Sequence, residues 1–237
     1  MKADILKPSS YVKHLEGTYA VVHTMGILLE ADYKGVVSGK ESPISGLRRA
    51  FSSTKKGSAR NPLEKGEERQ GGGDEGIGMG EADGQITYEL MNRDSALSLA
   101  TEAQARDVST YAYISAAAGA PVLPARYINT KREAESLIST NFPRMRNLFF
   151  RPGLLYDSSR GFTMPIMAAG MIGHTVNEWL FRGGLTRFVG AMVEKPIKAD
   201  LLAEAVVEGL AEEDVRGVQQ TREIEGLAAK AWRRGML

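Results

Sequence analysis

The chain contains no cysteine, only three histidines and no long run of apolar residues. The lack of cysteine excludes disulfides and thiolate chemistry. His14, His23 and His174 show no spacing suited to a metal ion, so no metal site is predicted. The apolar stretch 162–173 is interrupted by Pro165 and is far shorter than the roughly 20 residues that a membrane-spanning helix needs. A formal net charge of +1 gives no support for a nucleic-acid partner or an acidic substrate.

Length and composition indicate one ordinary domain over residues 1–237. With 43% apolar and 25% charged residues, the chain can bury a normal core around a sheet. Residues 52–85 are rich in glycine and charge, and we expect them to form a disordered insertion. Within it, the glycine-rich run 71–80 resembles a phosphate-binding loop only superficially. No apolar strand precedes this run, so we do not expect it to bind phosphate.

Apolar runs alternate with segments of helical periodicity, which predicts a parallel sheet flanked by helices on both faces. We expect strands near 19–25, 108–115 and 147–151. Helices are expected at 87–107, 127–139, 199–212 and 224–234. The third of these should turn one apolar face inward, formed by Leu201, Leu202, Ala205, Val206 and Leu210. We interpret His23, within the first of these strands, as a buried, hydrogen-bonded strand residue rather than a ligand.

Tyr127 and Lys131 lie four residues apart at the start of a helical pattern, so both side chains share one face. An ammonium so close to a phenol favours the phenolate. This predicts a lowered pKa for Tyr127 and a hydroxyl able to donate or accept a proton. Ser115, twelve residues upstream, ends a strand-like run. The Tyr/Lys spacing alone arises often by chance, and an exposed pair on a helix explains it equally well.

Other segments place this pair in a wider pattern. An acidic residue at a predicted strand end, Asp4, precedes a strand and a small-residue turn at 17–26. The run 144–153 reads as a buried strand stopped by proline and glycine, and Asp200 lies near the start of a late helix. Taken in order with Ser115 and the Tyr-x-x-x-Lys pair, these segments resemble the short-chain dehydrogenase/reductase superfamily, in its extended or atypical branch.

That resemblance implies a Rossmann-like, doubly wound parallel α/β sheet and a set of site residues. In the superfamily, the serine and tyrosine hold a substrate carbonyl and the lysine binds the nicotinamide ribose. An asparagine on the preceding helix orders a water in a proton relay. These roles fall on Ser115, Tyr127, Lys131 and Asn92, although a surface asparagine is the alternative for Asn92. NAD(P) is the implied cofactor, and its contacts fall on Asp4, Met25, Gly26, Lys131, Pro152 and Gly153.

A narrower resemblance rests on 23–40 together with 127–135. Both segments are similar to the fungal mitochondrial NAD(P)-binding proteins of the coenzyme Q synthesis complex, relatives of the NAD(P)H-binding accessory subunit of respiratory complex I. This implies a mitochondrial location and partners among the proteins of that complex. Residues 160–195 correspond to the substrate lid. Their methionines and aromatics would line a pocket for an apolar, quinone-like ligand, unless the segment is an ordinary amphipathic packing helix.

Two functions of different class follow from this resemblance. The first is an NAD(P)-dependent oxidoreductase that acts in or supports ubiquinone biosynthesis. The second is a non-catalytic scaffold or assembly subunit of a mitochondrial respiratory or quinone-synthesis complex. The intact Ser-Tyr-Lys set favours the first function, and the narrow resemblance favours the second.

The glycine-rich turn that normally holds the pyrophosphate is not found. A dinucleotide-binding fold begins with a strand, this turn and a helix whose N-terminus faces the phosphates. Nothing before Asp4 supplies them. We therefore expect an N-terminally incomplete fold that lacks its first βαβ unit. Either the sequence is a fragment, which we favour, or the protein has lost its phosphate-binding turn. We also expect it to bind NAD(P)H weakly or not at all.

Overall fold

The described part of the chain forms two compact units that interleave along the sequence. The computed structural model describes residues 3–27, 63, 87–117, 125–157 and 195–236. The helical unit comprises Met1–Thr18, Thr24–Val108 and Val122–Phe142. The sheet unit comprises Tyr19–His23, Ser109–Pro121 and Pro143–Leu237.

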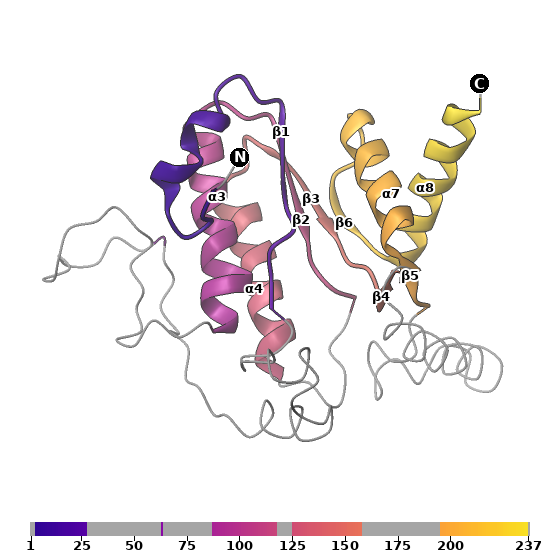
Figure 1. The fold of residues 1–237 in the computed structure, drawn as a ribbon, viewed down its shortest axis with the longest axis horizontal. Helices are drawn as coiled ribbons and strands as arrows, with labels where there is room; N and C mark the ends of the chain where they lie inside the picture. The colour runs from indigo at the N-terminus through magenta and orange to yellow at the C-terminus, as the bar shows by residue number, and fades with distance from the viewer. Residues whose placement is uncertain (1–2, 28–62, 64–86, 118–124, 158–194, 237) are drawn as a thin grey trace, which may run out of the picture. The chain divides into compact units, whose positions relative to one another are not determined.

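A parallel sheet organises the sheet unit (Figure 1). Its strands are β1 (Ala20–His23), β2 (Thr110–Ile114), β3 (Arg146–Phe150) and β6 (Gly217–Gln219), hydrogen-bonded in the order β1-β2-β3-β6. Every neighbouring pair is parallel, and the register places Ala112 opposite both Val22 and Leu148. The three predicted strands and their parallel pairing are confirmed. Helices on both faces stay a prediction.

Two further strands and the fourth strand of the sheet were not predicted. β4 (Leu155–Tyr156) and β5 (Ile197–Lys198) pair in parallel as a separate ribbon. β6 contains only three residues. Strands this short show no measurable alternation of apolar and polar residues, so periodicity cannot identify them.

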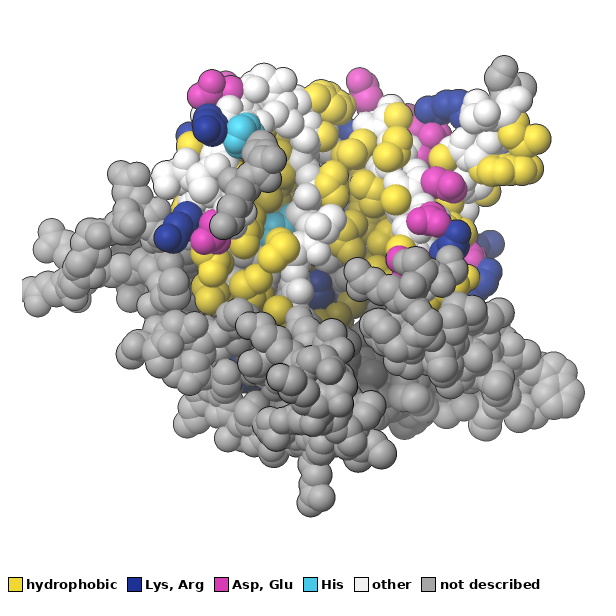
Figure 2. All heavy atoms as spheres, viewed as in Figure 1, with side chains coloured by type: hydrophobic (Ala, Val, Ile, Leu, Met, Phe, Trp, Pro, Cys, Tyr) yellow, Lys and Arg dark blue, Asp and Glu magenta, His cyan; other side chains and the backbone are white. Residues whose placement is uncertain are grey.

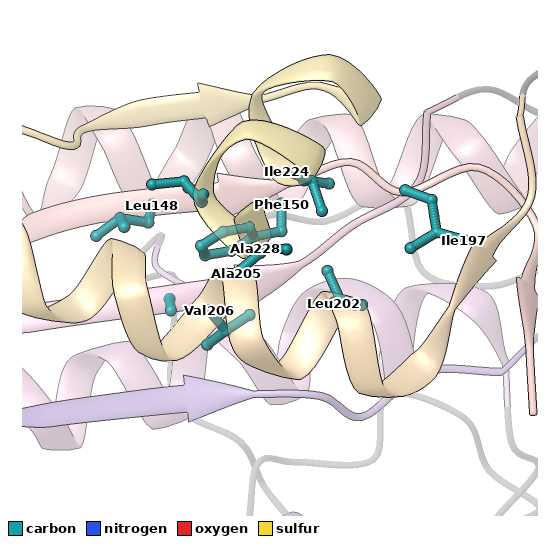
Figure 3. Close-up of a cluster of buried hydrophobic side chains, with 10 residues drawn as sticks. Leu148, Phe150, Ile197, Leu202, Ala205, Val206, Ile224 and Ala228 are labelled. Atoms are coloured by element: carbon teal, nitrogen blue, oxygen red, sulfur yellow. The ribbon is translucent and has the colours of Figure 1, made fainter. Parts of the chain in front are cut away.

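The core of the sheet unit lies between the strands and two helices, α7 (Ala199–Ala211) and α8 (Thr221–Gly235) (Figure 3). α7 approaches β3 closely at Gly209, where an added Cβ would lie 3.1 Å from the Phe150 ring and 3.3 Å from Leu148. The predicted inward face of α7 is confirmed, with Leu201 and Leu210 only partly buried. The buried members of this cluster are Ala112, Leu148, Phe150, Ile197, Leu202, Ala205, Val206, Ile224, Leu227 and Ala228.

α7 and α8 lie side by side and are joined by ion pairs (Figure 1). Glu208 pairs with Arg234 at 2.8 Å, and Glu212 pairs with Lys230 at 2.9 Å. The two helices therefore run antiparallel. α8 begins three residues before the predicted position, because a capping box between Gln220 and the Glu223 side chain closes its first turn.

Some apolar side chains of these two helices remain at the surface. Figure 2 shows apolar groups among charged ones where α7 and α8 run. Val207, Trp232 and Met236 are each more than 60% exposed. Among the described helices, none combines the length and apolar character needed to cross a membrane.

The described residues of the helical unit contain five short or medium helices. Its elements are η1 (Pro8–Ser10), η2 (Val12–His14), the π-helix η3 (Glu89–Asp94), α3 (Ser95–Gln104) and α4 (Ala125–Asn141). α3 and α4 lie side by side in Figure 1. The helix predicted for 87–107 thus starts as a π-helix and ends early, before Asp107 adopts a left-handed φ of 55°.

Three predictions concern segments at the margins of the described structure. Around Asp4 the described residues form a turn rather than a strand end, with the Asp4 carboxylate accepting the N–H of Leu6 at 3.0 Å. The predicted insertion 52–85 and lid 160–195 lie outside the described residues, apart from Leu63 and Lys195. The organisation as a single domain stays a prediction.

One buried cation connects the sheet to α7. Arg146, the first residue of β3, is 8% exposed, and its Nε donates to the Thr110 hydroxyl on β2 at 3.2 Å. Carbonyl groups at a helix C-terminus have no partners within the helix and carry partial negative charge, so a guanidinium satisfies them well. The other hydrogen bonds of the Arg146 guanidinium go to carbonyl oxygens at the end of α7 and just beyond it: Gly209 (3.0 Å), Leu210 (2.7 Å), Glu212 (2.6 Å) and Val215 (3.2 Å).

We expect Arg146→Met to lower the free energy of unfolding by about 3 kcal/mol, because the substitution leaves buried carbonyl groups without donors. Urea unfolding of the purified protein measures this. Arg222→Met, at an exposed arginine of α8, is the control and should change stability by less than about 0.5 kcal/mol. Equal losses in the two variants would contradict the role given to Arg146.

Candidate functional site

Three of the predicted site residues meet in the helical unit. Gly26 follows β1 in the sequence, Asn92 lies in η3 and Lys131 in α4. A Cβ added at Gly26 would lie 2.9 Å from Asn92 Oδ1 and 3.3 Å from Lys131 Nζ. The same Asn92 oxygen accepts the backbone N–H of Ile27 at 3.0 Å. Only glycine permits so close an approach of the backbone to these two polar groups. We call Gly26, Asn92 and Lys131 the glycine–lysine cluster.

Asn92 is fully buried, so the alternative of a surface asparagine is wrong. Its Nδ2 donates to the Thr130 hydroxyl on α4 at 3.4 Å. The π-helix that carries Asn92 is a feature the sequence reasoning missed. A single π turn inside a helical segment is uncommon and occurs often at functional sites.

Tyr127 and Lys131 share one face of α4, as predicted. The Lys131 Nζ lies 5.9 Å from the centroid of the Tyr127 ring. Lys131 is only 5% exposed and Tyr127 is half-buried, so the alternative of an exposed pair on a helix is wrong. The edge of the Tyr88 ring meets Tyr127 with centroids 5.9 Å apart and an interplanar angle of 66°.

Burial decides the protonation of both residues. It lowers the pKa of Lys131 to about 8, and the nearby Glu135 carboxylate only partly opposes this effect. Burial also raises the pKa of Tyr127, with Arg132 acting in the opposite direction. The prediction that the pKa of Tyr127 is lowered is therefore wrong, because loss of hydration outweighs attraction to nearby cations. At neutral pH, Tyr127 keeps its proton and can donate it.

Polar contacts align η3 with α4 along several turns. Besides the Asn92–Thr130 hydrogen bond, Arg126 binds Glu89 and Arg93 binds Glu133 at 3.0 Å. The residue numbers of the partners increase together along η3 and α4, so the two helices run in the same direction. Sequence reasoning missed these residues, because opposite charges in two helices do not reveal which residues will meet.

The remaining predicted residues of the sheet unit gather at the carboxyl ends of its strands. Ser115 follows β2, and its N–H donates to the carbonyl of Phe150 at 2.7 Å. Two residues further on, the N–H of Ala117 donates to the carbonyl of Pro152 at 2.7 Å. Pro152 and Gly153 thus leave β3 beside the end of β2. Open α/β sheets bind ligands at this edge.

His23 ends β1 at the same edge of the sheet. It is 1% exposed, as expected for a buried strand residue, and its ring lies 5.4 Å from that of Tyr113 on β2. Among the described residues, no group of three histidine or acidic side chains is placed to hold a metal ion.

The predicted residues do not all come together. Asp4 lies in the exposed turn before η1, where Ser10 and Leu6 are its hydrogen-bond partners, and it does not join the glycine–lysine cluster. Met25 is 42% exposed. Convergence of Ser115 with Tyr127 and Lys131 stays a prediction.

We expect Gly26→Ala to lower the free energy of unfolding by about 1–2 kcal/mol, because the new methyl group must displace Asn92 or Lys131. Gly226→Ala in α8 is the matched control. A Cβ there meets nothing within 4 Å, and the gain in helix propensity should stabilise the protein by roughly 0.5–1 kcal/mol. Urea unfolding of both variants shows whether each substitution raises or lowers the free energy of unfolding. A neutral or stabilising Gly26→Ala would show that the cluster tolerates a side chain.

The lowered pKa of Lys131 predicts a rise in stability at alkaline pH. An unfolded lysine titrates near pH 10.4, so between pH 8 and about 10 the unfolded chain binds more protons than the folded one. The free energy of unfolding should therefore increase over this window, on the order of 2 kcal/mol. Lys131→Met should lose this rise, and Lys13→Met, at an exposed lysine, should keep it. Urea unfolding at pH 7.5 to 10 tests this. The same dependence of the free energy of unfolding on pH in the two variants would contradict it.

No protein-family profile matches the chain. MIOREX complex component 2 of Saccharomyces cerevisiae is 30% identical over 238 residues, which cover 94% of this chain and 78% of the yeast protein. Among solved structures, RMD from Pseudomonas aeruginosa complexed with NADPH has a TM-score of 0.50 at 17% identity, over 98% of this chain and 71% of RMD. UDP-N-acetylglucosamine 4-epimerase from Bacillus cereus has a TM-score of 0.46 at 13% identity, over 95% and 69% of the two chains.

The likeness to RMD confirms the predicted fold class. The described elements form a parallel α/β sheet of the Rossmann-like type, the fold that this chain shares with RMD. The likeness to the yeast protein extends over nearly the whole sequence. The chain therefore belongs to the family of MIOREX complex component 2.

Proposed function

We propose that this protein binds NAD(P)H weakly, which is one of the two outcomes expected from its sequence, and is a short-chain dehydrogenase-like oxidoreductase of mitochondria that acts in or supports ubiquinone biosynthesis. The observation that carries the cofactor proposal is the glycine–lysine cluster. In this cluster the buried Lys131 ammonium lies 3.3 Å from the position that a Cβ of residue 26 would occupy, and an ammonium group donates hydrogen bonds to oxygen atoms of ligands. The absence of a side chain at Gly26 leaves the backbone itself beside that ammonium.

The residues of the helical unit fit the ribose end of a nicotinamide nucleotide. An ammonium donates up to three hydrogen bonds, which suits the vicinal hydroxyls of a ribose. Asn92 fixes the turn at Ile27 and thereby holds Gly26 next to Lys131. RMD, which shares the fold, was solved with NADPH, and this supports the same class of cofactor for this chain.

The protonation states suit Tyr127 as a proton donor. Burial keeps its hydroxyl protonated at neutral pH, so it would donate to a carbonyl oxygen as negative charge develops there. The resemblance to the superfamily assigns Ser115 to the same carbonyl. NAD(P)H, when bound, supplies the hydride.

A second function is favoured by the name of the yeast relative. MIOREX complex component 2 is described as a component of a complex, so this chain is a candidate scaffold or assembly subunit with protein partners. The mitochondrial location and the quinone-synthesis partners rest on the resemblance of 23–40 and 127–135. In this second reading the nucleotide is retained for structure, and Tyr127 carries out no chemistry.

Titration of the protein with NADPH, followed by the fluorescence of the dihydronicotinamide, tests cofactor binding. The titration should extend to millimolar NADPH, since weak binding is expected from the sequence. Lys131→Ala should weaken the affinity about tenfold, which corresponds to roughly 1.4 kcal/mol for a lost charge-assisted hydrogen bond. Lys13→Ala, at an exposed lysine, should leave the affinity unchanged. Absence of any saturable signal would overturn the cofactor proposal.

Tyr127→Phe separates the two functions. It should keep NADPH affinity in both cases, because the phenol is assigned to the substrate rather than to the ribose. Cells that lack the protein should contain less ubiquinone. If the protein is an oxidoreductase, the natural chain restores ubiquinone and Tyr127→Phe does not. Full rescue by Tyr127→Phe would instead support the scaffold.

A further inference from the structure

A two-pronged ion pair joins the start of η3 to the start of α4. Glu89 Oε1 accepts from Arg126 Nε at 3.0 Å, and Oε2 accepts from Nη2 at 2.6 Å. The Glu89 side chain is only 10% exposed, and that of Arg126 is 34% exposed. Parallel bonds from a guanidinium to both carboxylate oxygens fix orientation as well as distance. Because ion pairs removed from water add little net stability, this one is better explained by the geometry that it imposes.

The geometry that it imposes concerns Tyr127. Arg126 immediately precedes Tyr127, and its guanidinium carbon lies 5.7 Å from the centroid of the Tyr88 ring. Tyr88, 1% exposed, in turn meets the Tyr127 ring edge-on. The ion pair and the two aromatic rings therefore form one connected set of contacts around the tyrosine.

The position of Tyr127 in α4 gives this set of contacts a role. α4 begins at Ala125, so Tyr127 lies in its first turn. The first four N–H groups of a helix have no acceptors within it, and first turns open more readily than helix centres. The other contacts with η3, through Thr130 and Glu133, lie further along α4. Of these polar contacts, only the Glu89–Arg126 pair reaches the turn that carries Tyr127.

We propose that Glu89 is a positioning residue of this site: its carboxylate binds the guanidinium of Arg126 and thereby holds the first turn of α4, with Tyr127, in one orientation. Glu89 acts through Arg126 and Tyr88 and touches no substrate. The role rests on the function proposed above, because the orientation of Tyr127 matters only if its hydroxyl serves a ligand. A misplacement of about 1 Å is enough to impair a proton donor.

Fluorine NMR of the protein labelled with 3-fluorotyrosine tests this without nucleotide or substrate. The chain has eight tyrosines, and Tyr127→Phe identifies the signal of Tyr127 by its loss. In Glu89→Gln the fluorine signal of Tyr127 should shift. The pKa of the Tyr127 hydroxyl should also fall toward its ordinary value, because burial is the main cause that raises this pKa. Glu133→Gln, which breaks the Arg93 pair of the same two helices, is the matched control and should leave the signal in place.

Two further variants show whether Glu89 acts through Arg126. The double variant Glu89→Gln with Arg126→Gln should shift the signal no more than the larger single shift, since residues in one chain of contacts are not additive. Arg126→Lys keeps the charge but cannot bind both oxygens of the Glu89 carboxylate in parallel, so it should give an intermediate shift of the Tyr127 signal. This variant keeps the test decisive if Glu89→Gln does not fold. An unmoved signal in Glu89→Gln, or an equal shift in Glu133→Gln, overturns the proposal. If the natural chain does not bind NADPH, the proposed function is overturned, whereas the NMR result on the position of Tyr127 still stands.

Discussion

The sheet unit depends on the buried guanidinium of Arg146. A charge removed from water is costly unless every donor finds an acceptor, and here the acceptors are carbonyl groups that α7 cannot satisfy by itself. One side chain thus meets the needs of both β3 and the helix end. With α7 fixed in this way, Gly209 can approach Phe150 closely, and the apolar faces of α7 and α8 close over the strands.

The helical unit differs from the sheet unit, because polar groups are buried between its helices. Nearly all of η3 is inaccessible to water, including Glu89, Asn92 and Arg93. Each of these side chains is matched by a residue of α4, so the interface specifies one register rather than a range of packings. The same burial raises the pKa of Tyr127 and lowers that of Lys131. The contacts that align the two helices therefore also set the proton chemistry of the candidate site.

Family membership and site geometry support different parts of the functional account. The likeness to MIOREX complex component 2 extends over most of the chain and is the basis of the proposed scaffold role. The glycine–lysine cluster and the protonated Tyr127 are the basis of the proposed nucleotide binding and proton donation. These properties are compatible, because a dehydrogenase fold can occupy a place in a complex and keep its site. The fold alone does not decide between them, since similar folds carry unrelated activities.

Local pattern in the sequence determined the three main strands, their parallel pairing, the inward face of α7 and the placing of Tyr127 and Lys131 on one helix face. The strands and the helix faces follow from the period of a strand or helix, and the parallel pairing follows from the alternation of strands with helices; neighbouring residues encode both. Only the tertiary structure decided the π turn at Asn92, the burial of Lys131 and the direction of the Tyr127 pKa. Partners such as Glu89 and Arg126 are 37 residues apart in the sequence, and hydration depends on what the folded chain places around a group. Periodicity carries no information about either.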